Sequence, residues 1–176
     1  MEILYHFAMS VDGYIATPSG GVEWLDAFEG EDYGFMDMWA SVDCVLMGSK
    51  TYEFALAQKE WLAPDKPSWV FTHRDLPVAH ESVTLTDAEP AAVVGELEAA
   101  GHERGWLLGG GALATSFRDA GLLTHYEIGI VPVVLGEGLP MLAPLDRFES
   151  LRSTGAETYD NGVVKVCYEL ERADEG

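Results

Sequence analysis

Strand-like and helix-like segments alternate along most of this chain. Continuous apolar runs predict buried strands, and residues with helical spacing follow each of them. The predicted strands are 2–9, 43–48, 68–73, 82–86 and 104–108, and the predicted helices fall within 31–42, 49–57, 89–101 and 112–121. Because such alternation requires right-handed crossovers, the pattern predicts an α/β fold with a mainly parallel sheet and helices on both faces.

The last part of the chain follows a different pattern. Residues 124–136 predict one long strand, and residues 149–171 alternate in polarity on both sides of Asn161–Gly162. Asn-Gly between two alternating runs is a strong signal for a β-hairpin. We therefore expect antiparallel strands to follow the alternating part, with a C-terminal hairpin at one side of the sheet. One domain over residues 1–176 is expected, because no segment has the composition of a linker.

The stretch WLLGGGALATSF places Gly109, Gly110 and Gly111 between a predicted strand and a predicted helix. Backbone without side chains lets a ligand come close, and the free N–H groups at a helix N-terminus suit a phosphate. The motif is interpreted as a phosphate-binding turn; the alternative is a turn that only packs. Gly109, Gly111 and Ala114 also match the G-x-G-x-x-A pattern of Rossmann dehydrogenases. That motif normally opens the sheet, so a Rossmann dehydrogenase is a minor alternative here.

Two more polar segments follow neighbouring predicted strands. They are GSKT (Gly48, Ser49, Lys50, Thr51) and, within FTHRD, the residues Thr72, His73 and Arg74. A P-loop is excluded because position 43, where its first glycine would stand, is Asp43. Lys50 and Arg74 would lie at adjacent strand ends, an arrangement that suits a phosphate monoester such as the 2′-phosphate of NADP. The alternative is two cations that merely face solvent.

The charge of the chain limits its partners. Ten Lys and Arg stand against 30 Asp and Glu, so the net charge is 10 − 30 = −20. Nucleic acid and anionic membranes repel such a chain, so we expect neither as a partner and expect a small-molecule substrate instead. Cys44 and Cys167 are interpreted as free thiols in a reducing compartment, and the five histidines lack metal-ligand spacing. The spacing of the histidines therefore predicts no bound metal. The N-terminus has neither a signal peptide nor a membrane span, so we expect a cytoplasmic protein.

Five segments in a fixed order resemble a known superfamily. They are MSVDGYIA, VDCVLMGSKTYE, SWVFTHRDLP, WLLGGGALATSF and VPVVLGEGLPML. Together they resemble the dihydrofolate reductase-like superfamily, and within it the C-terminal reductase domain of the bifunctional riboflavin-biosynthesis deaminase-reductase. The resemblance covers nearly the whole chain. It implies NADPH-dependent hydride transfer on a strongly twisted, mainly parallel sheet.

The resemblance also implies a cofactor site. It assigns the adenosine phosphates of NADPH to two groups of residues, Lys50 and Thr51, and Thr72, His73 and Arg74. It assigns the pyrophosphate and the nicotinamide to the backbone of Gly109, Gly110, Gly111, Ala112 and Leu113, beside the strand edges of Ala8, Ile15 and Ala16. With Gly48 and Ser49 at the start of a helix, these residues form the expected cofactor-binding set.

The catalytic carboxylate is expected in the acidic segment before the first predicted helix. Asp32 lies sixteen residues before Gly48, the spacing at which dihydrofolate reductases carry their active-site carboxylate. Trp24 lies in the loop before it, and Asp26 is a second acidic candidate. The alternative for Asp32 is an acid that only stabilises a helix N-terminus through the helix dipole.

The sequence leaves the substrate open between an aminopyrimidine of riboflavin biosynthesis and a pteridine or folate. No basic residue is placed obviously for a folate tail or for a ribose phosphate, and Ala114 stands where folate reductases carry an aromatic side chain. A non-catalytic nucleotide-binding protein on the same fold is the alternative function. We also expect a homodimer built through the C-terminal strands, since exposed strand edges favour association and the related reductase domains pair in this way.

Overall fold

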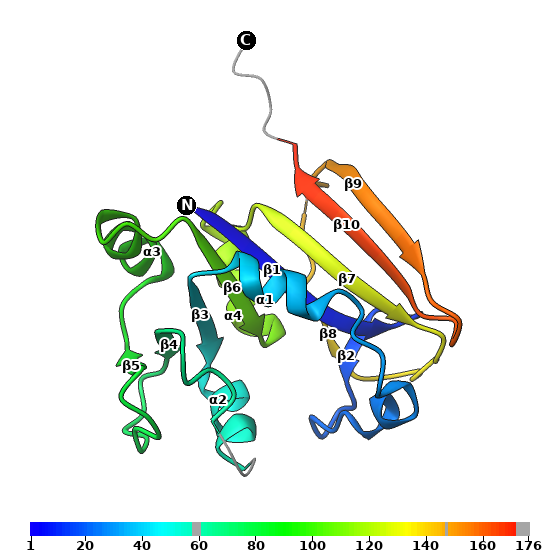
Figure 1. Cartoon of the computed structure of the whole chain (residues 1–176), viewed down its shortest axis with the longest axis horizontal. Coiled ribbons are helices and arrows are strands. Elements are labelled where there is room, and N and C mark those ends of the chain that lie inside the picture. The colour runs from blue at the N-terminus through cyan, green and yellow to red at the C-terminus, as the bar shows by residue number, and fades with distance from the viewer. Residues whose placement is uncertain (58–60, 147, 172–176) are drawn as a thin grey trace.

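The computed structural model describes residues 1–57, 61–146 and 148–171 (Figure 1). Its main sheet has eight strands in the order β5-β4-β3-β6-β1-β7-β10-β9. The strands are β1 (Glu2–Ser10), β3 (Cys44–Gly48), β4 (Ser68–Phe71), β5 (Val83–Thr86), β6 (Arg104–Gly109), β7 (His125–Val131), β9 (Leu151–Thr158) and β10 (Val164–Leu170). The first six in spatial order, from β5 to β7, pair in parallel, and β10 and β9 are antiparallel. The structure thus confirms the mainly parallel sheet.

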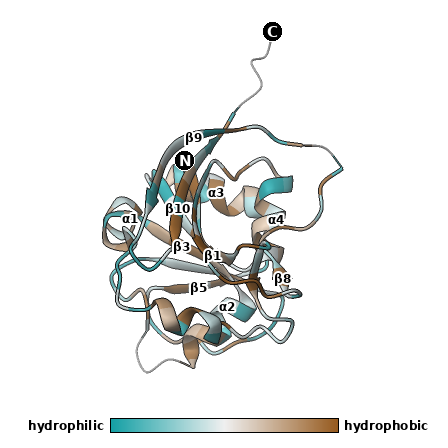
Figure 2. Cartoon of the chain, turned by 90° about the vertical axis from the view of Figure 1, so that its right-hand side faces the viewer, coloured by the Kyte–Doolittle hydropathy of each residue, from teal (hydrophilic) through white to brown (hydrophobic). Residues whose placement is uncertain are grey.

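Helices cover both faces of this sheet, as predicted. They are α1 (Phe35–Ser41), α2 (Ser49–Leu56), α3 (Pro90–Ala99) and α4 (Gly111–Asp119). The 3₁₀ helix η1 (Glu23–Phe28) lies in the loop between β2 and α1 and has no buried residue. Met38 of α1 and Tyr52 of α2 belong to one buried hydrophobic cluster, and Val93 of α3 and Phe117 of α4 belong to the other. The strands between them are strongly apolar (Figure 2), because a strand covered on both faces can expose neither set of side chains.

The structure of the segment after α4 differs from the prediction in two respects. First, β7 is parallel to β1, whereas antiparallel strands were expected there. The physical reason is that α4 separates β6 from β7, so that β6, α4 and β7 form one more right-handed crossover unit. Second, the strand predicted over residues 124–136 ends at Val131. Pro132 has no N–H to donate, and the N–H of Val133 turns back to the carbonyl of Val131 at 2.7 Å.

The chain then crosses to a small second sheet. In it β8 (Leu139–Pro140) pairs antiparallel with β2 (Tyr14–Ala16), a short strand in the loop after β1. The C-terminal hairpin of β9 and β10 is confirmed, with Gly162 in its turn at φ +87°. None of the helices in the described ranges is both long and apolar enough to cross a bilayer.

Candidate functional site

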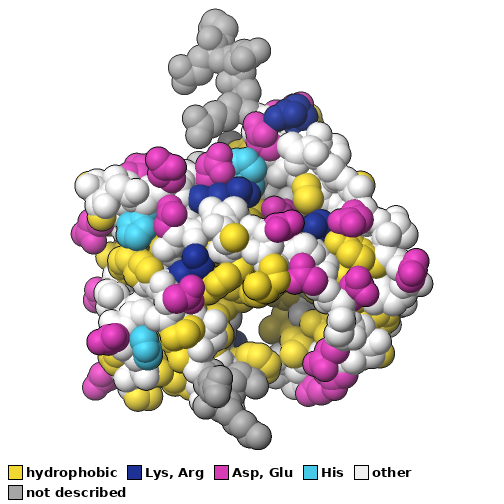
Figure 3. All heavy atoms as spheres, viewed as in Figure 1, with side chains coloured by type: hydrophobic (Ala, Val, Ile, Leu, Met, Phe, Trp, Pro, Cys, Tyr) yellow, Lys and Arg dark blue, Asp and Glu magenta, His cyan; other side chains and the backbone are white. Residues whose placement is uncertain are grey.

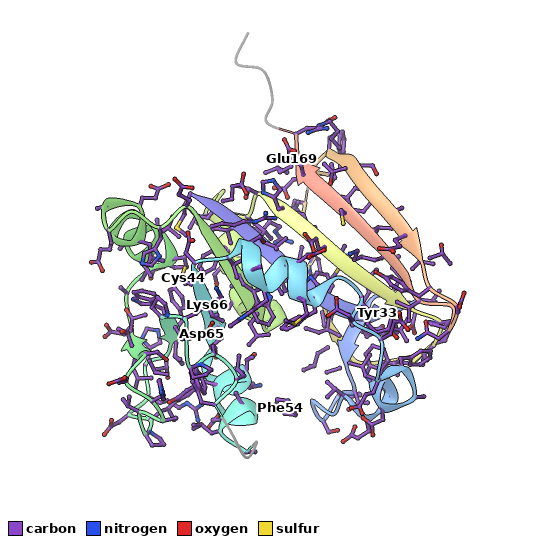
Figure 4. All side chains as sticks on the ribbon, in the orientation of Figure 1. Tyr33, Cys44, Phe54, Asp65, Lys66 and Glu169 are labelled. Atoms are coloured by element: carbon purple, nitrogen blue, oxygen red, sulfur yellow. The ribbon has the colours of Figure 1, made fainter. Side chains whose placement is uncertain are left out.

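A cleft of about 1430 Å³ opens at the carboxyl ends of the parallel strands. Figure 3 shows the hollow, with hydrophobic side chains around it. It is bounded on one side by α2 and on the other by the loops that contain β2 and the segment before α1. Phe54 of α2 and Tyr33 of that segment stand on opposite sides of the opening (Figure 4). In a parallel sheet this edge is the usual place for a ligand.

Two helix N-termini without side-chain caps meet in this cleft. The N-cap of α2 is Gly48 and that of α4 is Gly110, and no side chain among the described residues caps either helix. A Cβ atom placed on Gly48 would lie 3.8 Å from the carbonyl oxygen of Gly109 and 4.0 Å from the amide nitrogen of Gly110, so the two turns are in contact. The first N–H groups of a helix have no partner inside it. The two turns therefore bring uncapped donors and two positive dipole ends to one place, which suits a pyrophosphate.

Two of the three consecutive glycines, Gly110 and Gly111, differ in their surroundings. A side chain on Gly111 would run into the carbonyl oxygens of Pro140 and Met141, so this glycine is required by packing within the chain. A Cβ on Gly110 would meet only the Thr51 hydroxyl, at 3.7 Å, so this position is open toward the cleft. The interpretation as a packing turn therefore applies to Gly111, whereas the space at Gly110 is compatible with the predicted phosphate-binding turn.

The two predicted cations differ in their surroundings. Lys50 is exposed and lines the cleft. Arg74 does not line it, and both of its terminal nitrogens bond the carboxylate of Glu53 on α2. The Arg74 guanidinium lowers the pKa of Glu53. Thr72 and His73 also lie outside the cleft lining, and the Thr72 hydroxyl accepts the backbone N–H of Arg74 at 3.0 Å.

The predicted nicotinamide edge is assembled from two strands, β1 and β2. Ala8 of β1 and Ile15 and Ala16 of β2 all line the cleft. The small sheet holds β2 in place, and Asp12 in the preceding turn accepts the N–H groups of Leu135 and Gly136 at 3.1 and 2.7 Å. The pKa of Asp12 is lowered to about 2, first by the Ser10 hydroxyl and then by these two amides.

The predicted catalytic residues lie beside the cleft rather than in it. The Asp32 carboxylate is exposed and accepts the N–H of Met36, at 3.2 Å, in the first turn of α1. Trp24, Asp26 and Asp32 are absent from the cleft lining, as is Gly109, whereas Ala112, Leu113, Ser49 and Thr51 belong to it. The acids of this segment that do line the cleft are Glu29 and Glu31. The structure therefore gives Asp32 the helix-stabilising contact that was its alternative role.

Two residues at the floor of the cleft were not predicted from the sequence. His6 and Lys165 both line it. In the sheet, His6 lies opposite Glu127, and Ala8 lies opposite Gly129, which in turn lies opposite Lys165. The available signal was the alternation of β1, which sends His6 and Ala8 to the same face. It could not show that Glu127 faces His6, because that pairing depends on the parallel register of β7.

A second depression, of about 1920 Å³, lies at the opposite ends of the strands. Each of the three arginines that the described residues place around it has an acidic partner (Arg104–Glu2, Arg118–Asp119, Arg152–Glu169). It contains neither of the glycine turns and none of the residues expected to bind a cofactor. The cleft at the carboxyl ends is therefore the candidate site. In the described residues, no three His, Cys, Asp or Glu side chains are grouped as metal ligands.

Comparison with known proteins identifies the reductase-domain family that the sequence resembles. The profile of the RibD C-terminal domain family matches residues 55–165. The uncharacterized protein YwjB of Bacillus subtilis is 33% identical over 164 residues, which cover 92% of this chain and 94% of that protein. A putative riboflavin biosynthesis protein from Shewanella sp. PV-4 is 25% identical, with a TM-score of 0.88 over 98% of this chain and 100% of that one. Dihydrofolate reductase from Enterococcus faecalis, solved with NADP(H), is 13% identical, with a TM-score of 0.68 over 97% of both chains, which shows the shared fold.

Proposed function

The chain belongs to the RibD C-terminal domain family, and on that premise we propose that it is an NADPH-dependent oxidoreductase acting on a small heterocyclic substrate. The observation that carries the proposal is the meeting of two uncapped helix N-termini, at Gly48 and Gly110, in one cleft. NADPH would supply the hydride, and the protein would supply binding, orientation and control of protons.

The residues of the cleft fit an anionic dinucleotide. The amides at the start of α2 and α4, with the Thr51 hydroxyl between them, would hold the pyrophosphate. Lys50 would bind the 2′-phosphate, because it is the cation of α2 that lines the cleft. The edge formed by Ala8, Ile15 and Ala16 would flank the nicotinamide. The open position at Gly110 supports this assignment, since a side chain there would occupy the cradle.

The substrate half of the cleft suits a planar ring with few charges. Its walls include apolar and aromatic side chains from several elements, among them Phe28, Trp106 and Val163. Pteridines and aminopyrimidines have this shape, and both can stack on a nicotinamide. We propose that the acidic segment before α1 contacts the ring N–H groups. Asp32 and Asp26 are the candidates predicted from the sequence, and Glu31 is one of the two acids of this segment that line the cleft.

Two measurements test the proposal. The purified chain is first titrated with NADPH and NADH while the fluorescence of its tryptophans and of the cofactor is followed. It is then mixed with NADPH and either 7,8-dihydrofolate or 5-amino-6-(5-phosphoribosylamino)uracil, and the loss of NADPH absorbance is recorded. Binding of NADPH and its oxidation by one of these acceptors is the expected result. Failure to bind either cofactor would contradict the proposal, and binding without turnover would favour a non-catalytic nucleotide-binding protein.

Two variants separate the acidic candidates. Glu31→Gln is expected to lower turnover by at least tenfold while the affinity for NADPH stays within about threefold, as expected for a group that acts on the substrate. Asp32→Ala is expected to lower the stability of α1 more than it lowers turnover, because the substitution removes the oxygen that accepts a helix N–H. The opposite pattern would return the catalytic role to Asp32.

A further inference from the structure

We propose that His6, held by Glu127, donates the proton that completes the reduction. This inference rests on the proposed function, since it concerns the same cleft and the same reaction. It is carried by a hydrogen-bonded pair that lies partly in the cleft and that the cofactor site does not use. The His6 Nδ1 atom lies 3.2 Å from Oε2 of Glu127, and His6 lines the cleft.

The hydrogen bond to Glu127 fixes which ring nitrogen of His6 carries the shared proton. The hydrogen bond from His6 lowers the pKa of Glu127, while burial raises it and the charges of Lys165 and Arg104 lower it further. An ionised carboxylate can only accept a hydrogen bond, so the proton of the bond lies on Nδ1 of His6. The other ring nitrogen, Nε2, forms no hydrogen bond within the described residues. Nε2 is therefore the atom that a ligand in the cleft can meet.

The surroundings hold the ring in one orientation. The ring of His6 makes edge contacts with the rings of Phe35 and Trp106, with centroids 6.2 Å apart in both cases. The indole N–H of Trp106 donates to the His6 carbonyl oxygen at 3.2 Å. The His6 side chain is 18% exposed. His6 and Ala8 stand on the same face of β1, about 7 Å apart along the strand, so the ring lies next to the predicted nicotinamide edge.

The charged and titratable groups around the pair come from the neighbouring strands of the sheet. From β6, Arg104 lies 3.9 Å from Glu127, and it also pairs with Glu2 of β1. From β10, Cys167 lies opposite Glu127 in register, and Lys165 pairs with Glu157 of β9 at 3.7 Å.

The helix on this side adds no charge to the pair. On α1 the residue in contact with His6 is the apolar Phe35, and Asp37 is exposed. Within the described residues, Glu127 is thus the acid in direct contact with His6.

The proton balance of the step is simple. A C=N or C=O bond of the substrate accepts the hydride at carbon, and its electron pair moves to the nitrogen or oxygen. That atom takes the proton from Nε2–H of the imidazolium. The ring is left neutral, with Nδ1–H still bonded to Glu127, and water restores the proton before the next turnover. Glu127 is a positioning residue in this scheme, because it touches His6 and not the substrate.

Three variants of the full chain test the assignment, each assayed from pH 5 to pH 9 with NADPH and the acceptor that the wild type reduces. His6→Asn keeps a polar side chain but cannot give a proton. It is expected to lower kcat by about 100-fold or more at neutral pH and to abolish the fall of kcat with rising pH, with NADPH affinity unchanged. Glu127→Gln is expected to lower kcat less and to move the pH profile. His125→Asn is the control, because His125 is a histidine of β7 that bonds Thr124 and lies outside the cleft lining.

A second readout does not depend on turnover. Imidazole ¹⁵N spectra of the full chain are expected to show the Nδ1–H tautomer of His6, and Glu127→Gln is expected to change the balance of tautomers. If the wild type reduces an acceptor and His6→Asn keeps kcat within threefold, the inference is overturned. The same holds if the spectra show the Nε2–H tautomer. If the wild type reduces no acceptor, the proposed function itself fails, and this result is distinct from either of the others.

Discussion

Arg74 and Glu53 form a two-point ion pair, with nitrogen-to-oxygen distances of 3.0 and 2.6 Å. The pair ties the loop after β4 to α2, the helix that also carries Lys50. Its consequence is that the two predicted cations are not equivalent. Arg74 already has a carboxylate partner, whereas Lys50 lines the cleft and forms no ion pair within the part of the chain described. Lys50 is therefore the residue expected to distinguish NADPH from NADH.

The first prediction concerns this preference. Lys50→Ala is expected to raise the Kd of NADPH about tenfold, the loss of one charge-assisted hydrogen bond, and to leave the Kd of NADH within twofold. Fluorescence titration with both cofactors measures the two values. Equal losses for NADPH and NADH would contradict the assignment of the 2′-phosphate to Lys50.

The ion pair between Arg74 and Glu53 leads to the prediction of a variant that binds NADPH more tightly. Glu53→Gln removes the charge that holds Arg74 and is expected to tighten NADPH binding severalfold, because the guanidinium becomes free to meet a phosphate nearby. Arg74→Ala is expected to weaken NADPH less than Lys50→Ala does. If Glu53→Gln weakened NADPH instead, the ion pair would be needed to position α2, and Arg74 would have no role in binding the phosphate.

Substitutions at the neighbouring glycines Gly110 and Gly111 are expected to have different effects, one on cofactor affinity and the other on stability. Gly110→Val places two methyl groups in the open cradle and should weaken NADPH and NADH alike, by about tenfold, in a folded protein. Gly111→Ala meets the carbonyls of Pro140 and Met141 and should lower the free energy of unfolding by about 1–3 kcal/mol. Thermal unfolding and cofactor titration of both variants measure this. A folded Gly110→Val variant with wild-type affinities would show that this glycine has no role in binding.

The Asp12 carboxylate gives a prediction about pH. Its pKa is lowered from 3.8 to about 2, so the folded state favours the charged form. Its stabilising contribution is complete above pH 3.8 and is lost as the pH falls to about 2. In urea unfolding, the stability difference between the wild type and Asp12→Asn should therefore be constant from pH 7 to pH 5 and should shrink below pH 4. A difference that stayed constant down to pH 2 would contradict the role of the ionised carboxylate.

The expected homodimer is a prediction about the outer strand. All eight residues of β9 are exposed, and this strand forms one edge of the sheet. The apolar side chains available there are Leu151 and, just before the strand, Phe148, which is 91% exposed. Val131 of β7 is buried within the chain and is therefore not available for such a contact. We expect light scattering at moderate salt to give twice the 19.2 kDa of one chain.

A substitution can locate the contact. Phe148→Ser is expected to shift the protein toward monomers, while Val78→Ser, at another exposed apolar residue, should leave the mass unchanged. A mass near 19.2 kDa for the wild type at every concentration would show that the edge needs no partner.

Much of the architecture could be predicted from local pattern. The apolar runs, the helical spacing and Asn161–Gly162 predict the strands, the helices and the hairpin, because these depend on residues close in sequence. The glycine turn and GSKT could likewise be placed at strand ends, and the structure brings them into contact. The end of β7 at Val131 and its parallel pairing were missed, since the apolar pattern continues past Pro132 and gives no sign of direction.

The sequence by itself determined which residue types stand at the ends of the parallel strands, and through them the family; the cofactor class that we propose rests on the same residues. Only the tertiary structure decided which of those side chains are free. Arg74 is held by Glu53, Asp32 bonds α1, and His6 meets Glu127, which is 121 residues away. The physical reason is that hydrogen bonds and ion pairs act over a few ångströms, and the register of the sheet, not the spacing along the chain, brings such partners within reach.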